Sequence, residues 1–181
     1  MVYLIIGAII ALIILWLMTV QRKLVMMDEN INNSLSQIGV QLSSRWDALS
    51  ALLDLTKGYA KHEYETLSET IKARRAITKS SSPSDVEGQQ NIITETLGRI
   101  MAVAESYPDL KANQNYLKTM DALNQYENMV RTSRLIYNDS VTKLNRSIRI
   151  FPTVLVAGML GFHQRDYLQA DKAKENMPSM K

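Results

Sequence analysis

The sequence predicts an all-α protein, in which an N-terminal transmembrane helix is followed by an antiparallel bundle of three long helices and a short fourth apolar helix. Three observations support this. Residues 2–20 form an uncharged apolar run whose only plainly polar member is Thr19. Apolar residues beyond this run recur every three or four positions, the spacing of one helix face. The alternation typical of β-strands is absent, and the breaks between periodic segments are short enough for helix connections.

The apolar run is long enough to cross a bilayer. At about 1.5 Å per residue, residues 2–20 extend about 28 Å, close to the roughly 30 Å thickness of the hydrocarbon layer. A cleavable signal peptide is not favoured, because no basic residue precedes the run and residues 17–21 offer no small-residue cleavage site. No cysteine is present for lipid attachment. We therefore expect residues 1–22 to be a retained anchor that contacts membrane lipid through residues 2–20.

The first long helix of the bundle is expected to run from about Leu24 to about Lys79. Gly58 is its weakest interior position, because glycine lowers helix stability by about 1 kcal/mol relative to alanine. The segment Ser80–Asp85 ends it, since serines favour local turns and Pro83 cannot continue a helix interior. Its apolar stripe consists of Ile31, Leu35, Ile38, Leu42, Leu49, Leu52 and Thr56.

Two further helices follow. The second begins with Ser84 or Asp85 as its cap, presents Ile93, Leu97, Ile100 and Ala104, and ends before Pro108. The third repeats every 3.5 residues, which is typical of coiled-coil packing. Its stripe consists of Tyr116, Met120, Leu123, Glu127, Val130, Arg134, Tyr137, Val141, Leu144, Ile148 and Phe151.

The order of the helices in space has two solutions. In an up-down-up bundle, residues 107–113 reverse the chain. In a long hairpin, the second and third helices run on one after the other, and residues 151–162 return to the membrane. We expect the bundle, because Pro108-Asp109 followed by an Asn113 cap is typical of a turn.

Charged residues interrupt the two longest stripes. Arg45, Glu127 and Arg134 fall at core positions, where charges are tolerated when paired. We expect a buried polar layer with a structural role that fixes the register of the helices. A small active site is the alternative, but one carboxylate between two arginines lacks the second acid or base that general catalysis needs.

Residues 151–162 are uncharged and too few to span a bilayer. We expect a short helix that completes the core, with an oligomer contact or a membrane-interface contact as alternatives. Residues 163–181 are expected to form a flexible polar tail, so the bundle covers residues 23–162. The candidate interface or membrane residues are Phe151, Val154, Leu155, Met159, Leu160 and Phe162.

Other chemistry has little support in the sequence. The two histidines, His62 and His163, are far apart, and no phosphate-binding glycine motif occurs, so neither a metal nor a cofactor is expected. The net charge of +3 is spread along the chain, which does not indicate a nucleic-acid partner.

Several blocks closely resemble the LemA family of bacteria: residues 36–42 (SQIGVQL), 57–63 (KGYAKHE) and 102–113 (AVAESYPDLKAN), with Tyr137-Asn138, Asn145 and residues 151–162 in agreement. The resemblance implies a membrane-anchored helical bundle without an agreed activity or catalytic residues. Some relatives look like lipoproteins, which places their bundles outside the cytoplasm. Others are linked to magnetosome membranes.

We expect a single-pass protein of the bacterial cell membrane. Arg22 and Lys23 follow the apolar run and favour a cytoplasmic bundle, with an extracytoplasmic one as the alternative. The function expected is that of a scaffold, not an enzyme, that self-associates or organises protein partners at the membrane. The alternative is an adaptor or regulator that docks on a membrane protease or signalling protein.

Overall fold

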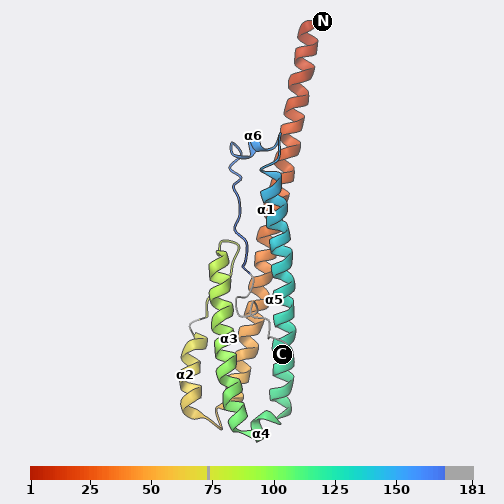
Figure 1. The fold of residues 1–181 in the computed structure, drawn as a ribbon. Coiled ribbons are helices and arrows are strands. Elements are labelled where there is room, and N and C mark those ends of the chain that lie inside the picture. The colour runs from red at the N-terminus through yellow and green to blue at the C-terminus, as the bar shows by residue number, and fades with distance from the viewer. Residues whose placement is uncertain (73, 170–181) are drawn as a thin grey trace, which may run out of the picture.

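The computed structural model describes residues 1–72 and 74–169, and every regular element in these residues is a helix (Figure 1). The prediction of an all-α protein is confirmed. The elements are α1 (Val2–Thr56), α2 (Lys61–Lys72), α3 (Pro83–Ser106), α4 (Pro108–Lys111), α5 (Gln114–Ser147) and α6 (Val154–Ala157).

Helix α1 is uninterrupted over 55 residues and contains both the apolar run and the first helix of the bundle. Its N-terminal part projects beyond the other helices (Figure 1). This projecting part contains a stretch that is apolar and long enough to cross a membrane. The expected boundary between residues 22 and 23 therefore lies inside a continuous helix, and no new helix begins near Leu24.

The predicted continuation of this helix to Lys79 is wrong, because α1 ends at Thr56. The Arg45–Glu127 ion pair, with 3.8 Å between Nη2 and Oε2, marks which residues of the antiparallel helices α1 and α5 lie level with each other. Because the helices are antiparallel, counting 13 residues forward from Arg45 and 13 residues back from Glu127 reaches the same height: Gly58 on the α1 side and Gln114, the first residue of α5, on the other. Beyond this height, a longer α1 would have no α5 beside it. The chain instead turns at residues 57–60, and α2 folds back so that Leu67 is buried.

Helix α3 begins earlier than expected. Its cap is Ser82, not Ser84 or Asp85. The Ser82 hydroxyl accepts a hydrogen bond from the Asp85 backbone N–H at 3.2 Å, and the Asp85 carboxylate accepts one from the Ser82 N–H at 2.8 Å. This reciprocal arrangement satisfies two backbone donors at the helix start, and Pro83 fits the first helical position, where no backbone N–H is needed.

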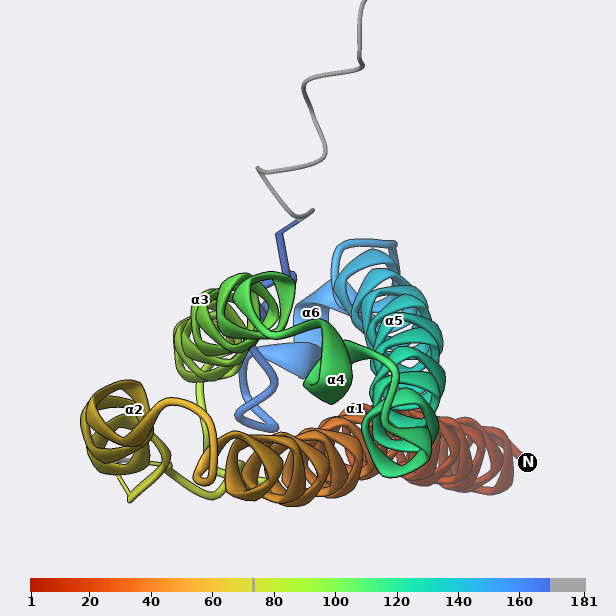
Figure 2. The ribbon, with the colours of Figure 1, turned by 90° about the horizontal axis from the view of Figure 1, so that it is seen from below.

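The chain reverses between α3 and α5 at the predicted place (Figures 1 and 2). The order of the long helices nevertheless differs from the predicted up-down-up arrangement, because α2 carries the chain back, so that α3 runs parallel to α1 and α5 runs antiparallel to it (Figure 1). Helix α4 occupies the turn, and Asn113 caps α5 by accepting a hydrogen bond from the Asn115 N–H at 2.8 Å. The long hairpin is therefore excluded. Helix α5 ends at Ser147, four residues before the end of its predicted stripe.

The core lies between α1, α3 and α5, and α2 covers one side (Figure 2). The predicted stripes supply it, with Leu42, Leu49, Ile93, Leu123 and Val130 all buried. One close approach fixes the loop before α3. A Cβ atom on Gly39 of α1 would lie 2.4 Å from the backbone oxygen of Ile77.

The C-terminal segment differs from the expected flexible tail. Residues 163–169 lie along α5, where the Asn145 side chain both donates to the Arg165 carbonyl and accepts from the Arg165 N–H, each at 2.9 Å. Asn138 makes the same pair of bonds with Leu168, at 2.9 and 3.0 Å, and Leu168 is buried. Each of these two side-chain amides therefore both donates to and accepts from one residue of the C-terminal backbone, as a residue of a neighbouring β-strand would. Residues 170–181 of the predicted tail lie outside the described residues.

Candidate functional site

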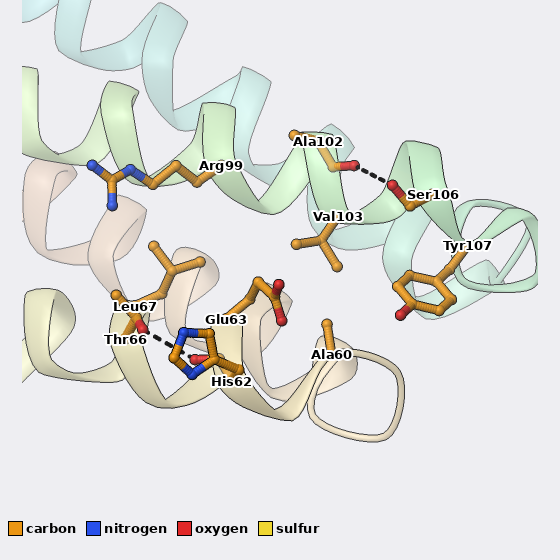
Figure 3. Close-up of a pocket in the computed structure, with 10 residues that line it drawn as sticks. All are labelled: Ala60, His62, Glu63, Thr66, Leu67, Arg99, Ala102, Val103, Ser106 and Tyr107. Carbon is orange, nitrogen blue, oxygen red and sulfur yellow. Dashed lines mark hydrogen bonds between the residues drawn. The ribbon is translucent and has the colours of Figure 1, made fainter.

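A pocket of about 520 Å³ lies between α2 and α3 (Figure 3). These helices meet near the end of the bundle that is farthest from the apolar run (Figure 1). Two of the blocks that resemble the LemA family, residues 57–63 and 102–113, form opposite walls. The lining residues are Ala60, His62, Glu63, Thr66, Leu67, Arg99, Ala102, Val103, Ser106 and Tyr107.

The turn after α1 positions the first wall. Ala60 is buried there, and the ring of Tyr59 packs against that of Tyr107 with centroids 5.7 Å apart. The Tyr64 hydroxyl donates a hydrogen bond to Asp54 at 3.3 Å, which ties α2 to the end of α1. The second wall is the last part of α3, which ends at the Tyr107-Pro108 step. The pocket thus depends on both helix ends.

The pocket combines apolar and polar side chains. Leu67 and Val103 supply apolar surface, while His62, Glu63 and Arg99 supply polar groups around it (Figure 3). Arg99 pairs with Glu95 at 2.6 Å on its own helix. The Ser106 hydroxyl donates to the Ala102 carbonyl at 3.3 Å, so it is engaged with backbone and not with a base. Such mixed surface suits a protein side chain or a short helix.

The predicted polar layer is only partly present. Arg45 is 2% exposed, and its Nη2 lies 3.8 Å from Oε2 of Glu127, whose side chain is 40% exposed. Arg134 lies seven residues further along α5, about 10 Å away along the helix, and donates instead to the Gln90 side chain and the Gln169 carbonyl. The three residues therefore do not form one layer. Arg45 and Glu127 pair α1 with α5, and Arg134 joins α5 to α3 and to the C-terminal segment.

Burial also affects Tyr137, beside this segment. Its hydroxyl donates to the Asp166 carbonyl at 3.1 Å, and burial raises the pKa of the phenol, so it stays a neutral donor. In residues 1–72 and 74–169, no group of three His, Cys, Asp or Glu side chains is arranged to hold a metal ion.

A second, shallower groove of about 340 Å³ runs between α1 and α5. Small side chains line it, including Ser44 and Ala48 on α1 and Thr119 and Ala122 on α5. Exposed apolar residues lie on the same two helices, with Val40 62% and Met129 46% exposed.

The expectation that residues 151–162 complete the core is wrong for most of them. Ala157 is buried, Val156 and Phe162 pack partly against the core, and the helix spans only Val154–Ala157. The other five candidate contact residues are exposed: Phe151 75%, Val154 46%, Leu155 63%, Met159 87% and Leu160 38%. Their neighbour Ile150, which is not among the predicted contact residues, is 54% exposed.

Comparison with known proteins decides the family. A model of the LemA family matches residues 34–181. The chain belongs to the LemA family. The protein LemA of Metamycoplasma hominis is 29% identical over 157 residues, which cover 84% of this chain and 70% of the relative. The magnetosome proteins MamQ 1 and MamQ 2 of Paramagnetospirillum magneticum are each 34% identical over 77 residues, which cover 42% of this chain and 28% of theirs.

The LemA match covers the pocket and residues 151–162, and it begins after the apolar run. Family membership and the long apolar helix are consistent with a membrane-anchored protein. The pocket was not predicted from the sequence. Its signal was nevertheless present, because two of the blocks that carry the resemblance are the segments that the fold brings together around it.

Proposed function

We propose that this LemA family protein is a membrane-anchored scaffold, without catalytic activity, that holds a protein partner at the distal end of its bundle. The observation that supports it is the pocket between α2 and α3, built from two separate family blocks. The apolar run of α1 is the anchor. From Gln21 to Thr56, α1 extends about 54 Å at 1.5 Å per residue. The pocket is thus presented about 50 Å from the membrane.

Site-specific photocrosslinking in cells tests this proposal. A photoreactive amino acid replaces Thr66 or Ala102, both exposed residues of the pocket, or Gln125, an exposed residue of α5 used as the control. We expect a discrete protein adduct from Thr66 and Ala102 and none from Gln125. Adducts that are equally abundant at all three positions, or absent from both pocket positions, contradict a specific binding site there. If the adduct is a membrane protease or a signalling protein, the scaffold acts as its adaptor.

Self-association is a second candidate, favoured by the groove between α1 and α5. Small side chains along two neighbouring helices let another helix approach closely, and Val40 and Met129 offer apolar contact beside it. A second copy in the same membrane would present the same face. The similarity to magnetosome proteins agrees with a role at a membrane.

The assembly size in mild detergent or native lipid patches tests this second candidate. Ala122→Arg places a cation in the groove, and Asn124→Arg places the same cation on another, exposed face of the same helix. We expect Ala122→Arg to reduce a defined oligomer to monomers, while Asn124→Arg leaves it unchanged. A wild-type protein that is monomeric in lipid contradicts self-association.

A further inference from the structure

We propose that residues 150–162 form a second membrane contact, which lies in the headgroup layer of the bilayer that α1 enters and takes anionic phospholipid. The inference rests on the proposed anchor and adds a lipid site to it. In this arrangement the bundle is attached to the membrane at two points, so its orientation relative to the bilayer is fixed.

The register of α1 and α5 places this segment at the right height. Ser147, the last residue of α5, lies 20 residues beyond Glu127, and 20 residues before Arg45 is Val25. Helix α5 therefore ends level with Val25, five residues beyond the apolar run. The chain returns at Arg165, which pairs with Asp28 of α1 at 2.8 Å. Figure 1 shows α6 and its flanking turns beside α1, where the N-terminal part begins to project.

The segment presents one face to the protein and another to its surroundings. Ala157 belongs to the core that also includes Val20, and Val156, Phe162 and Trp16 are partly buried and pack against this core. Ile150, Phe151, Leu155 and Met159 are 54%, 75%, 63% and 87% exposed. Burying these large apolar side chains in the membrane interface removes apolar surface from water, which is favourable.

Basic side chains lie at the same height as this segment. Arg22 and Lys23 follow the apolar run on α1, and Arg146 and Arg149 lie at the end of α5, all four exposed. Arg149 lies 22 residues after Glu127, and Lys23 lies 22 residues before Arg45, so the two cations lie at about the same height. Asp28, the nearest acid on α1, is already paired with Arg165. Apolar side chains with a basic border match the acyl chains and anionic headgroups of one leaflet.

The absence of cysteine allows a direct test with one probe at a time on the full-length protein in vesicles. An environment-sensitive fluorophore is attached to Leu155→Cys, to Leu135→Cys as the matched control, or to Ile10→Cys as the reporter of the anchor. Leu155 and Leu135 are 63% and 65% exposed, but Leu135 lies in the middle of α5. Quenching by nitroxide lipids, labelled at the headgroup or in mid-chain, reports the depth of each probe.

We expect headgroup nitroxides to quench the Leu155 probe several-fold more than the Leu135 probe. Adding phosphatidylglycerol to phosphatidylcholine vesicles should strengthen this quenching, and Arg146→Gln with Arg149→Gln should remove the added effect. Equal quenching of the two probes, while mid-chain nitroxides quench the Ile10 probe, overturns the lipid contact and leaves the anchor intact. A Leu155 probe that is shielded from water but not quenched indicates a protein contact and also overturns it. An unquenched Ile10 probe overturns the anchor itself.

Discussion

At the scale of single residues, polar side chains decide how helices are aligned and where they begin. Arg45 is buried and pairs with Glu127, and we expect this pair to select one alignment of α1 and α5. An apolar stripe alone permits slips by one heptad, whereas a buried charge has few acceptable partners. Ser82 and Asp85 fix the start of α3 in the same specific way.

Removing the carboxylate of Glu127 should destabilise the bundle. We expect Glu127→Ala to lower the free energy of unfolding by about 1–2 kcal/mol. This is less than the roughly 3–5 kcal/mol for a fully buried pair, because the Glu127 side chain is 40% exposed. Denaturant unfolding in mild detergent measures the change. The control is Glu95→Ala, which removes an exposed pair with Arg99 and should cost below about 0.5 kcal/mol. Equal losses in the two variants would contradict a special role for Glu127.

The capping box should make α3 sensitive to acid. The hydrogen bonds from the Ser82 side chain and backbone hold the pKa of Asp85 below its ordinary value of 3.8. A depressed carboxyl pKa stabilises the fold above the unfolded value, and this contribution is lost as the pH falls through the folded value. We therefore expect Asp85→Asn to be less stable than wild type at neutral pH, with a difference that shrinks in acid below the ordinary value. Unfolding free energies measured at both pH values check this. A difference that does not change with pH contradicts it.

At the scale of the elements, loops are positioned by the helices they cross. The loop before α3 runs over α1 at Gly39, where the Ile77 carbonyl occupies the space that a side chain would need. The C-terminal segment is held similarly, because Asn138 and Asn145 lie two turns apart on α5 and each pairs with one backbone unit.

Adding a methyl group at Gly39 should displace this loop. We expect Gly39→Ala to lower the free energy of unfolding by about 1–3 kcal/mol, since its Cβ would lie 2.4 Å from a backbone oxygen. Gly98→Ala is the control, because nothing lies within 4 Å of a Cβ on Gly98 in the exposed interior of α3. That variant should gain about 0.5–1 kcal/mol from helix propensity. Thermal unfolding compares the two variants. A Gly39→Ala variant that is more stable than wild type would contradict the prediction, because the loop would then move aside without a loss of stability.

At the scale of the whole molecule, one continuous helix joins the proposed anchor to the bundle. An uninterrupted α1 transmits the direction of the membrane span to the pocket, and the proposed lipid contact restricts rotation about that helix. The charge of Arg22 and Lys23 favours a bundle on the cytoplasmic side.

Cysteine labelling in intact cells checks this orientation. Gln125→Cys places one thiol on the exposed surface of α5 in a chain that otherwise has none. We expect a membrane-impermeant maleimide to label it only after the cells are broken, because a cytoplasmic bundle is shielded by the membrane. Labelling of intact cells would place the bundle outside the cytoplasm. A thiol-specific reagent that crosses membranes serves as the control for reactivity.

Local sequence patterns were sufficient to predict the properties that depend on neighbouring residues. Apolar spacing predicted the helical stripes, Asn113 predicted the cap of α5, and Pro108-Asp109 predicted the reversal, since period, capping and proline effects act within a few residues. Tertiary structure decided the rest. Helix α1 ends at Thr56, nearly level with the start of α5 at Gln114, and residues 163–169 lie along α5, where two distant asparagines pair with them. Phe151 and Leu155 are exposed because α5 ends level with Val25, and α1 is the only long helix of the described residues that continues beside them. A local sequence pattern cannot predict these features, because each depends on the length or position of a segment that is far away in the sequence.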